Sequence, residues 1–144
     1  MFLLDTRLEA DSAFVCRIAD CQLRLVNDAR FFWLLLIPET PDLRELHDLP
    51  EDRLVAVLRL AAGLGRGLQA ATGAGKINTA AIGNLVGQLH IHIVARDPTD
   101  AEWPRPVWGN GTAQPMTEAE RAARLELAAT LTAALATDRE PGGS

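Results

Sequence analysis

The sequence has few cysteines and no apolar run of membrane-spanning length. Cys16 and Cys21 are its only two cysteines, too few for a disulfide framework, and no third or fourth ligand lies near them to suggest a zinc site. The most apolar run, residues 31–37, falls far short of the ~20 residues that a membrane-spanning helix requires. Charged side chains within residues 5–9 interrupt any signal-like apolar run. We therefore expect a cytoplasmic protein with free thiols and no membrane partner.

An excess of basic residues is also missing. The 144-residue chain has 14 lysines and arginines against 19 aspartates and glutamates, for a net charge of −5. Because non-specific nucleic-acid binding depends on lysine and arginine, we expect no nucleic-acid partner. A nucleotide ligand stays possible, since backbone N–H groups and histidine can bind phosphate. No repeat or linker divides the chain, which predicts a single domain over residues 1–144.

Histidine is scarce, but two of the three histidines lie two residues apart within residues 87–94. Side chains alternate faces along a strand, so this segment has one aliphatic face and one polar face, formed by Gln88, His90, His92 and Val94. The Cα atoms of His90 and His92 would lie about 6.6 Å apart. That spacing lets both imidazoles act on one phosphate group or one metal ion.

A histidine on a half-buried strand is more often structural than functional. Burying Gln88, His90 and His92 together would leave many donors and acceptors to satisfy, and each unpaired group costs about 1–3 kcal/mol. A solvent-accessible site is therefore the favoured interpretation of this polar face.

The other segments predict an α+β fold. Alternating or apolar runs indicate strands at residues 14–19, 22–27, 31–37 and 76–82, in addition to the histidine strand. A long helix is expected from Asp48 as N-cap, followed by an apolar stripe that ends at Leu68. A capping box at 117–120 predicts a C-terminal helix to about Ala136, with Asp138 to Ser144 as a tail. We predict a mainly antiparallel sheet of about five strands with the long helix packed on it.

Three features of these segments leave alternatives open. Gly63, Gly65 and Gly67 either fray the long helix or permit a close backbone contact, because glycine costs about 1 kcal/mol relative to alanine inside a helix. The loop 83–87, bracketed by glycines, is typical of a turn but can also present N–H groups to an anion. The segment 96–110, with two tryptophans, either folds over its own core, closes the mouth of a site or reaches a partner subunit.

The motifs together resemble the histidine triad (HIT) superfamily of nucleotide hydrolases and transferases, whose signature is His-φ-His-φ-His-φ-φ with φ apolar. The matching stretch is Gln88-Leu89-His90-Ile91-His92-Ile93-Val94, in which glutamine replaces the first histidine. The resemblance covers about residues 14–108. It is most specific for a bacterial branch of small single-domain members, because of the segments Asn27-Asp28-Ala29-Arg30, Gly83-Asn84 and Trp103 to Gly109.

The resemblance implies a catalytic role for each residue of the motif. His90 corresponds to the nucleophile, whose imidazole nitrogen attacks the α-phosphorus and forms a nucleotidyl-imidazole that water then hydrolyses. His92 corresponds to the donor to the α-phosphate and the leaving atom. Gln88 can hydrogen-bond and orient His90, but it cannot titrate near neutral pH.

The resemblance also implies substrate-binding residues. Asn27 corresponds to the residue that binds the ribose hydroxyls, and Asn78 to a polar side chain that faces the phosphates or the leaving group. Gly83 and Asn84 match the loop that presents backbone N–H groups to phosphate. Leu85 stands where many members carry serine or threonine, which removes one hydroxyl donor.

The resemblance thus implies an enzyme of the dinucleoside polyphosphate hydrolase type, which cleaves a dinucleoside polyphosphate or a nucleoside phosphoramidate at the α-phosphate. It implies a homodimer and no metal or other cofactor. Two other functions stay open: a non-catalytic nucleotide-binding module, and a metal-binding protein that uses His90 and His92 with His47 as a third candidate ligand.

Overall fold

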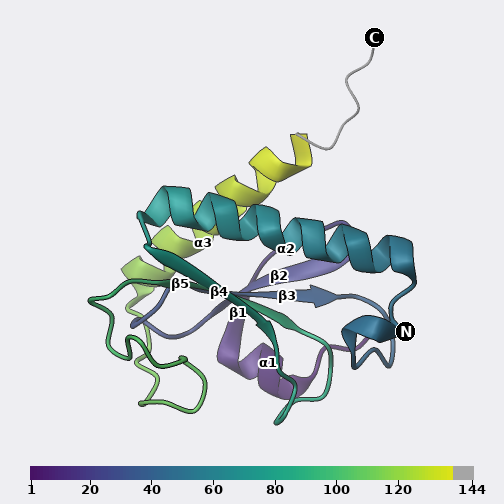
Figure 1. Cartoon of the computed structure of the whole chain (residues 1–144), viewed down its shortest axis with the longest axis horizontal. Coiled ribbons are helices and arrows are strands. Elements are labelled where there is room, and N and C mark those ends of the chain that lie inside the picture. Colours follow the sequence, from purple (N-terminus) through teal and green to yellow (C-terminus); the bar gives the residue numbers. More distant parts are fainter. Residues whose placement is uncertain (138–144) are drawn as a thin grey trace.

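Five strands form one antiparallel sheet in the computed structural model, which describes residues 1–137 (Figure 1). The strand order is β1-β2-β3-β5-β4, and every neighbouring pair is antiparallel. The strands are β1 (Ser12–Ile18), β2 (Cys21–Val26), β3 (Trp33–Pro38), β4 (Lys76–Ala81) and β5 (Ile91–Arg96). This sheet confirms the predicted α+β fold, whereas the predicted tail at 138–144 lies outside the described residues.

Helices cover both faces of the sheet. Figure 1 shows α2 (Glu51–Thr72) and α3 (Glu118–Thr137) on one side, with α1 (Thr6–Asp11) on the opposite side. A short 3-10 helix, η1 (Leu46–Asp48), precedes α2. The predicted capping box opens α3, because Thr117 and Glu120 exchange backbone-to-side-chain hydrogen bonds. By length and composition α2 could span a membrane, a test that core helices of soluble proteins also pass; here it packs against β4, β5 and α3.

The central strand β3 is apolar on both faces because both are covered. Leu34 and Leu36 belong to the main core beneath α2 and α3. The alternate residues Leu35 and Ile37 pack instead with Leu8 of α1 in a second cluster. Covering the second face with the N-terminal segment therefore accounts for the uninterrupted apolar run.

The three glycines of α2 serve close packing. A Cβ atom at Gly65 would lie 3.3 Å from Ile77 of β4, and one at Gly63 would lie 3.0 Å from Leu135 of α3. Gly67 likewise faces α3. The helix runs without interruption through all three positions, so the close-contact interpretation is confirmed and the fraying one is wrong.

The structure corrects the predicted starts of α2 and β3. The N-cap of α2 is Pro50, not Asp48, because the Asp48 carboxylate instead accepts the backbone N–H of Glu45 at the start of η1. Strand β3 begins at Trp33 rather than at Phe31, since Phe31 turns into a separate cluster with Val94.

The histidine strand is also shorter than predicted. β5 begins at Ile91, so His90 lies immediately before it. The backbone N–H of Leu89 donates to the carbonyl of Leu43 rather than to a partner strand. Helix α1 has no counterpart among the predicted elements, because it contains only six residues.

Candidate active site

His90 and His92 line one side of a cleft of about 700 Å³. Ile91 and Ile93 point into the core beneath α2, so the alternating histidines face the opposite side of the sheet. Their ring centroids are 4.8 Å apart. The residues are only 7% and 8% exposed, and the cleft is the space they face. The structure therefore brings the two predicted catalytic histidines together at one opening.

A backbone carbonyl orients His90. The Nδ1 atom of His90 lies 2.7 Å from the carbonyl oxygen of Gln88, and a carbonyl only accepts hydrogen bonds. Nδ1 therefore carries the proton. In the neutral ring, Nε2 then holds the free electron pair that a nucleophile requires.

The Gln88 side chain does not line the cleft. Its Oε1 accepts the backbone N–H of Asp5 at 2.9 Å, and its Nε2 donates to the carbonyl of Leu3 at 2.8 Å. The predicted orientation of His90 by Gln88 thus comes from the Gln88 main chain, while its amide fastens the N-terminal segment to the histidine segment.

Two tryptophans surround His92. The indole N–H of Trp33 donates to Nδ1 of His92 at 3.0 Å, and the Trp108 ring lies edge-on to His92 with centroids 5.2 Å apart. Burial, with a smaller contribution from the neighbouring His90, lowers the pKa of His92 to about 3. His92 is therefore uncharged at neutral pH.

The glycine-bracketed loop between β4 and β5 lies beside the histidines. Gly83 and Asn84, both predicted site residues, line the cleft together with Ile82, Leu85 and Val86. Gly83 adopts a φ of +71°, a conformation that favours glycine. The backbone N–H groups of residues 83–86 make no hydrogen bond to another described residue. Such unpaired N–H groups can bind an anion.

The far end of the cleft carries the loop that follows β2. Asn27 lines it, with its Oδ1 held by the backbone N–H of Met116 at 3.0 Å. Next to it, Arg30 and Asp28 form a buried ion pair at 2.8 Å. Burial would raise the pKa of Asp28, but hydrogen bonds from Arg30 outweigh it and lower that pKa. Arg30 also approaches Glu102, so its charge is already neutralised.

Asn78 does not line the cleft. Its Oδ1 accepts a hydrogen bond from Arg96 at 2.9 Å, and Arg96 also pairs with Asp100 and donates to the carbonyl of Arg105. Asn78 therefore helps to anchor the loop that leads to Trp108. The structure brings together His90, His92, Asn27, Gly83 and Asn84, and leaves Gln88 and Asn78 as supporting residues.

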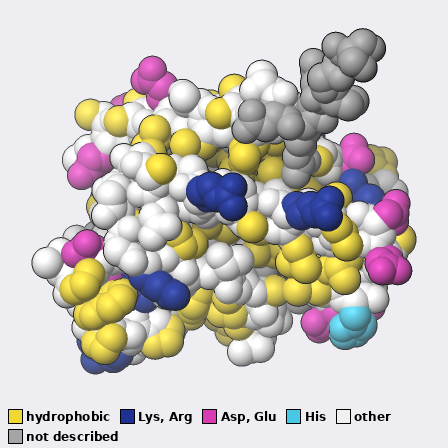
Figure 2. Space-filling model, turned by 45° about the horizontal axis from the view of Figure 1, so that its top comes forward, with side chains coloured by type: hydrophobic (Ala, Val, Ile, Leu, Met, Phe, Trp, Pro, Cys, Tyr) yellow, Lys and Arg dark blue, Asp and Glu magenta, His cyan; other side chains and the backbone are white. Residues whose placement is uncertain are grey.

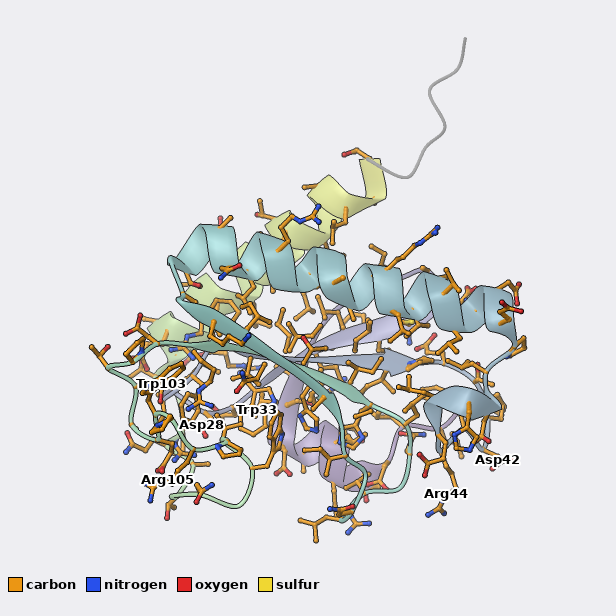
Figure 3. The ribbon with its side chains drawn as sticks, in the orientation of Figure 1. Asp28, Trp33, Asp42, Arg44, Trp103 and Arg105 are labelled. Atoms are coloured by element: carbon orange, nitrogen blue, oxygen red, sulfur yellow. The ribbon has the colours of Figure 1, made fainter. Side chains whose placement is uncertain are left out.

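Several residues that line the cleft are not predicted from the sequence as site residues. Trp33 belongs to an apolar run that predicts a buried strand, and the N-terminal residues Leu8, Ala10 and Asp11 come from the short α1 segment. Figure 3 shows Trp33 and Asp28 near the segment after β5 that carries Trp103 and Arg105. Of the two tryptophans in the 96–110 segment, Trp108 lines the cleft. It also packs against the buried cluster that contains Val107, so this part of the segment both covers the core and forms a wall of the cleft.

A metal centre finds no support in the residues that the structure describes. Within 1–137, no three His, Cys, Asp or Glu side chains lie together in a way that could hold a metal ion. His47 does not line the cleft; its side chain is 83% exposed and lies near Asp48.

The α+β fold, with its antiparallel five-stranded sheet and a His-x-His pair beside a cleft, agrees with the resemblance drawn from the sequence. A family model, the HIT domain, matches residues 7–99. The chain therefore belongs to the HIT domain family.

Solved structures of histidine triad proteins are similar over nearly the whole chain. One from Sinorhizobium meliloti is 41% identical with a TM-score of 0.86, covering 88% of this chain and 94% of that one. One from Marinobacter aquaeolei is 35% identical with a TM-score of 0.91, covering 94% and 98%. One from Bradyrhizobium japonicum is 34% identical with a TM-score of 0.88, covering 91% and 98%. No curated protein sequence matches the chain.

Proposed function

We propose that this protein is a nucleotidyl hydrolase or transferase that cleaves a nucleotide at its α-phosphate through a covalent intermediate on His90. The observation that carries the proposal is the shared cleft: two histidine rings 4.8 Å apart lie beside a loop whose backbone N–H groups are unpaired. A nucleophile, a hydrogen-bond donor and an anion-binding loop are the components that phosphoryl transfer requires.

The reaction proceeds in two displacements. Nε2 of His90 attacks the α-phosphorus, so that a P–N bond forms while the bond to the leaving group breaks, and a departing amine takes up one proton from solvent. His92 and the N–H groups of the 83–86 loop donate to the phosphoryl oxygens. Water then attacks the same phosphorus, the P–N bond to His90 breaks, and a nucleoside monophosphate leaves as one water proton passes to solvent. A second acceptor in place of water makes the reaction a transfer.

The charge of the cleft favours a substrate with few phosphates. Arg30 is the one arginine or lysine among the residues that line it, and Asp28 and Glu102 neutralise its charge. A polyphosphate would therefore enter without a free side-chain cation, whereas a phosphoramidate brings a single phosphate for the loop to bind. We infer that a nucleoside phosphoramidate is a better substrate than a dinucleoside polyphosphate.

The test is a pair of histidine variants. In His90→Ala we expect loss of turnover by at least about a thousandfold and no nucleotidylated protein in single-turnover mixtures. His47→Ala is the matched control, because His47 is exposed and does not line the cleft, and it should turn over normally. Normal turnover by His90→Ala would refute the proposal. Nucleoside monophosphate binding without turnover by the unaltered protein would favour a non-catalytic binding module.

A further inference from the structure

We propose that Trp33 is a positioning residue that fixes the tautomer of His92, so that His92 presents an Nε2–H donor to the cleft. The hydrogen bond between the Trp33 indole and Nδ1 of His92 forms within the chain and requires no bound substrate. Its consequence for a bound phosphate rests on the proposed function.

The chemistry of the two rings determines the direction of this bond. An indole N–H can only donate, so Nδ1 of His92, 3.0 Å away, must offer its electron pair. A neutral imidazole carries one proton, which therefore lies on Nε2. Protonating Nδ1 would turn an attraction between donor and acceptor into a contact between two donors.

Packing holds the indole in place. Trp33 is the first residue of β3 and pairs with Val94 of β5, two residues beyond His92. Its ring lies edge-on to Phe31 and Trp108, with centroids 6.4 Å and 6.2 Å away. The donor is thus attached to the strand next to the one that carries its acceptor, and the indole cannot rotate away without disturbing both aromatic contacts.

Trp108 provides an internal comparison. It also lies beside His92, with ring centroids 5.2 Å apart, yet its Nε1 is buried without a hydrogen-bond partner among the described residues. Both tryptophans therefore pack on the same histidine, but only Trp33 donates to it.

The two histidines then present complementary groups. The Gln88 carbonyl holds the proton of His90 on Nδ1 and leaves Nε2 as the nucleophile, whereas Trp33 holds the proton of His92 on Nε2. His90 is the titratable group beside His92, and Asp11, Asp28 and Arg30 line the same cleft. Trp33 therefore orders His92 from the neighbouring strand, and the Gln88 carbonyl orders His90.

Nuclear magnetic resonance of the ¹⁵N-labelled full-length protein tests the proposal without any substrate. At pH 7 we expect long-range ¹H–¹⁵N spectra to show His92 as a single Nε2–H tautomer, with the exposed His47 ring as reference. Trp33→Phe, which removes the N–H and keeps a ring, should convert His92 to a mixture of tautomers. Trp108→Phe should leave the tautomer unchanged. An Nδ1–H or doubly protonated His92 in the unaltered protein would overturn the proposal, as would an unchanged tautomer in Trp33→Phe.

A kinetic measurement tests the catalytic consequence separately. With a nucleoside phosphoramidate, Trp33→Phe should lower kcat about tenfold and change KM by less than about twofold, as expected for loss of one neutral hydrogen bond. An unchanged kcat would refute this consequence. Absence of turnover in the unaltered protein would refute the proposed function, whereas the spectra alone decide the tautomer.

Discussion

His90 and His92 are two residues apart and the same amino acid, yet their surroundings make them chemically different. A backbone carbonyl accepts from Nδ1 of His90, whereas an indole donates to Nδ1 of His92. Burial lowers the pKa of His92 to about 3, with a further contribution from His90. The difference between the two rings therefore comes from their hydrogen-bond partners, one two residues away in the chain and the other on the neighbouring strand.

The lowered pKa of His92 predicts a loss of stability in mild acid. In the unfolded chain His92 protonates below pH 6.5, but in the folded protein it stays neutral down to about pH 3. Between these pH values the unfolded state binds more protons than the folded state. The contribution of His92 to the free energy of unfolding is therefore complete above pH 6.5 and decreases as the pH drops. From pH 7 to pH 5 we expect a loss of about 2 kcal/mol, measured by denaturant titration.

The control for this prediction is His92→Gln, which cannot titrate. Its free energy of unfolding should change much less between pH 7 and pH 5. Asp28 and Asp100, whose pKa values lie below their ordinary value, lose their contributions only at lower pH. An equal pH dependence in both proteins would contradict the assignment to His92.

At the scale of elements, the N-terminal segment that includes α1 forms part of the wall of the cleft. Leu8, Ala10 and Asp11 line the cleft, and Leu8 packs with Leu35 of β3. The Gln88 amide connects this segment to the histidine segment through Leu3 and Asp5. Glutamine at the first position of the motif is therefore a link between two elements, and it does not line the cleft.

Gln88→Ala should loosen this segment while leaving His90 and His92 in place. We expect the Asp5 amide proton to exchange with solvent at least about tenfold faster, because its acceptor is lost, and KM to rise more than kcat falls. Gln69→Ala is the matched control, since the Gln69 amide donates to the carbonyl of Ala74, two residues beyond the end of α2. Unchanged exchange at Asp5 in Gln88→Ala would contradict the linking role.

At the scale of the whole molecule, charge bears on the choice of substrate. The chain carries a net charge of −5, and on the face seen in Figure 2 the basic side chains are scattered rather than gathered into one area. The cleft follows the same pattern, because the charge of Arg30 is neutralised by Asp28 and Glu102. In the proposed function, phosphate would therefore be bound by backbone N–H groups and the histidines rather than by a free side-chain cation.

A comparison of two substrates with the same base tests this view. Without divalent cations, kcat/KM for a nucleoside phosphoramidate should exceed that for a dinucleoside tetraphosphate by at least about tenfold. Added Mg²⁺ should narrow the ratio, because it neutralises part of the polyphosphate charge. A preference for the tetraphosphate in the absence of Mg²⁺ would contradict the inference from the cleft.

Local patterns in the sequence predict the elements and one side of the site. The alternation of apolar and polar residues separates Ile91 and Ile93 in the core from His90 and His92 beside the cleft, because side-chain direction along an extended chain follows from backbone geometry. It does not place Gln88 and Val94, which belong to the predicted polar face but do not line the cleft. The capping box at Thr117 predicts the start of α3 for a similar reason, since its hydrogen bonds span only three residues.

The partners of these residues depend on which segments meet in space, and no local pattern contains that information. The donor to His92 comes from Trp33, 59 positions earlier in the chain, and the acceptors of Arg96 include Asn78 on a neighbouring strand. Gln88 has the chemistry of a site residue, but the N-terminal segment covers it and uses its amide. Residue types and their periodicity thus establish which groups are present and which way they point, whereas the pairing of β3 with β5 decides which nitrogen of His92 meets the Trp33 indole.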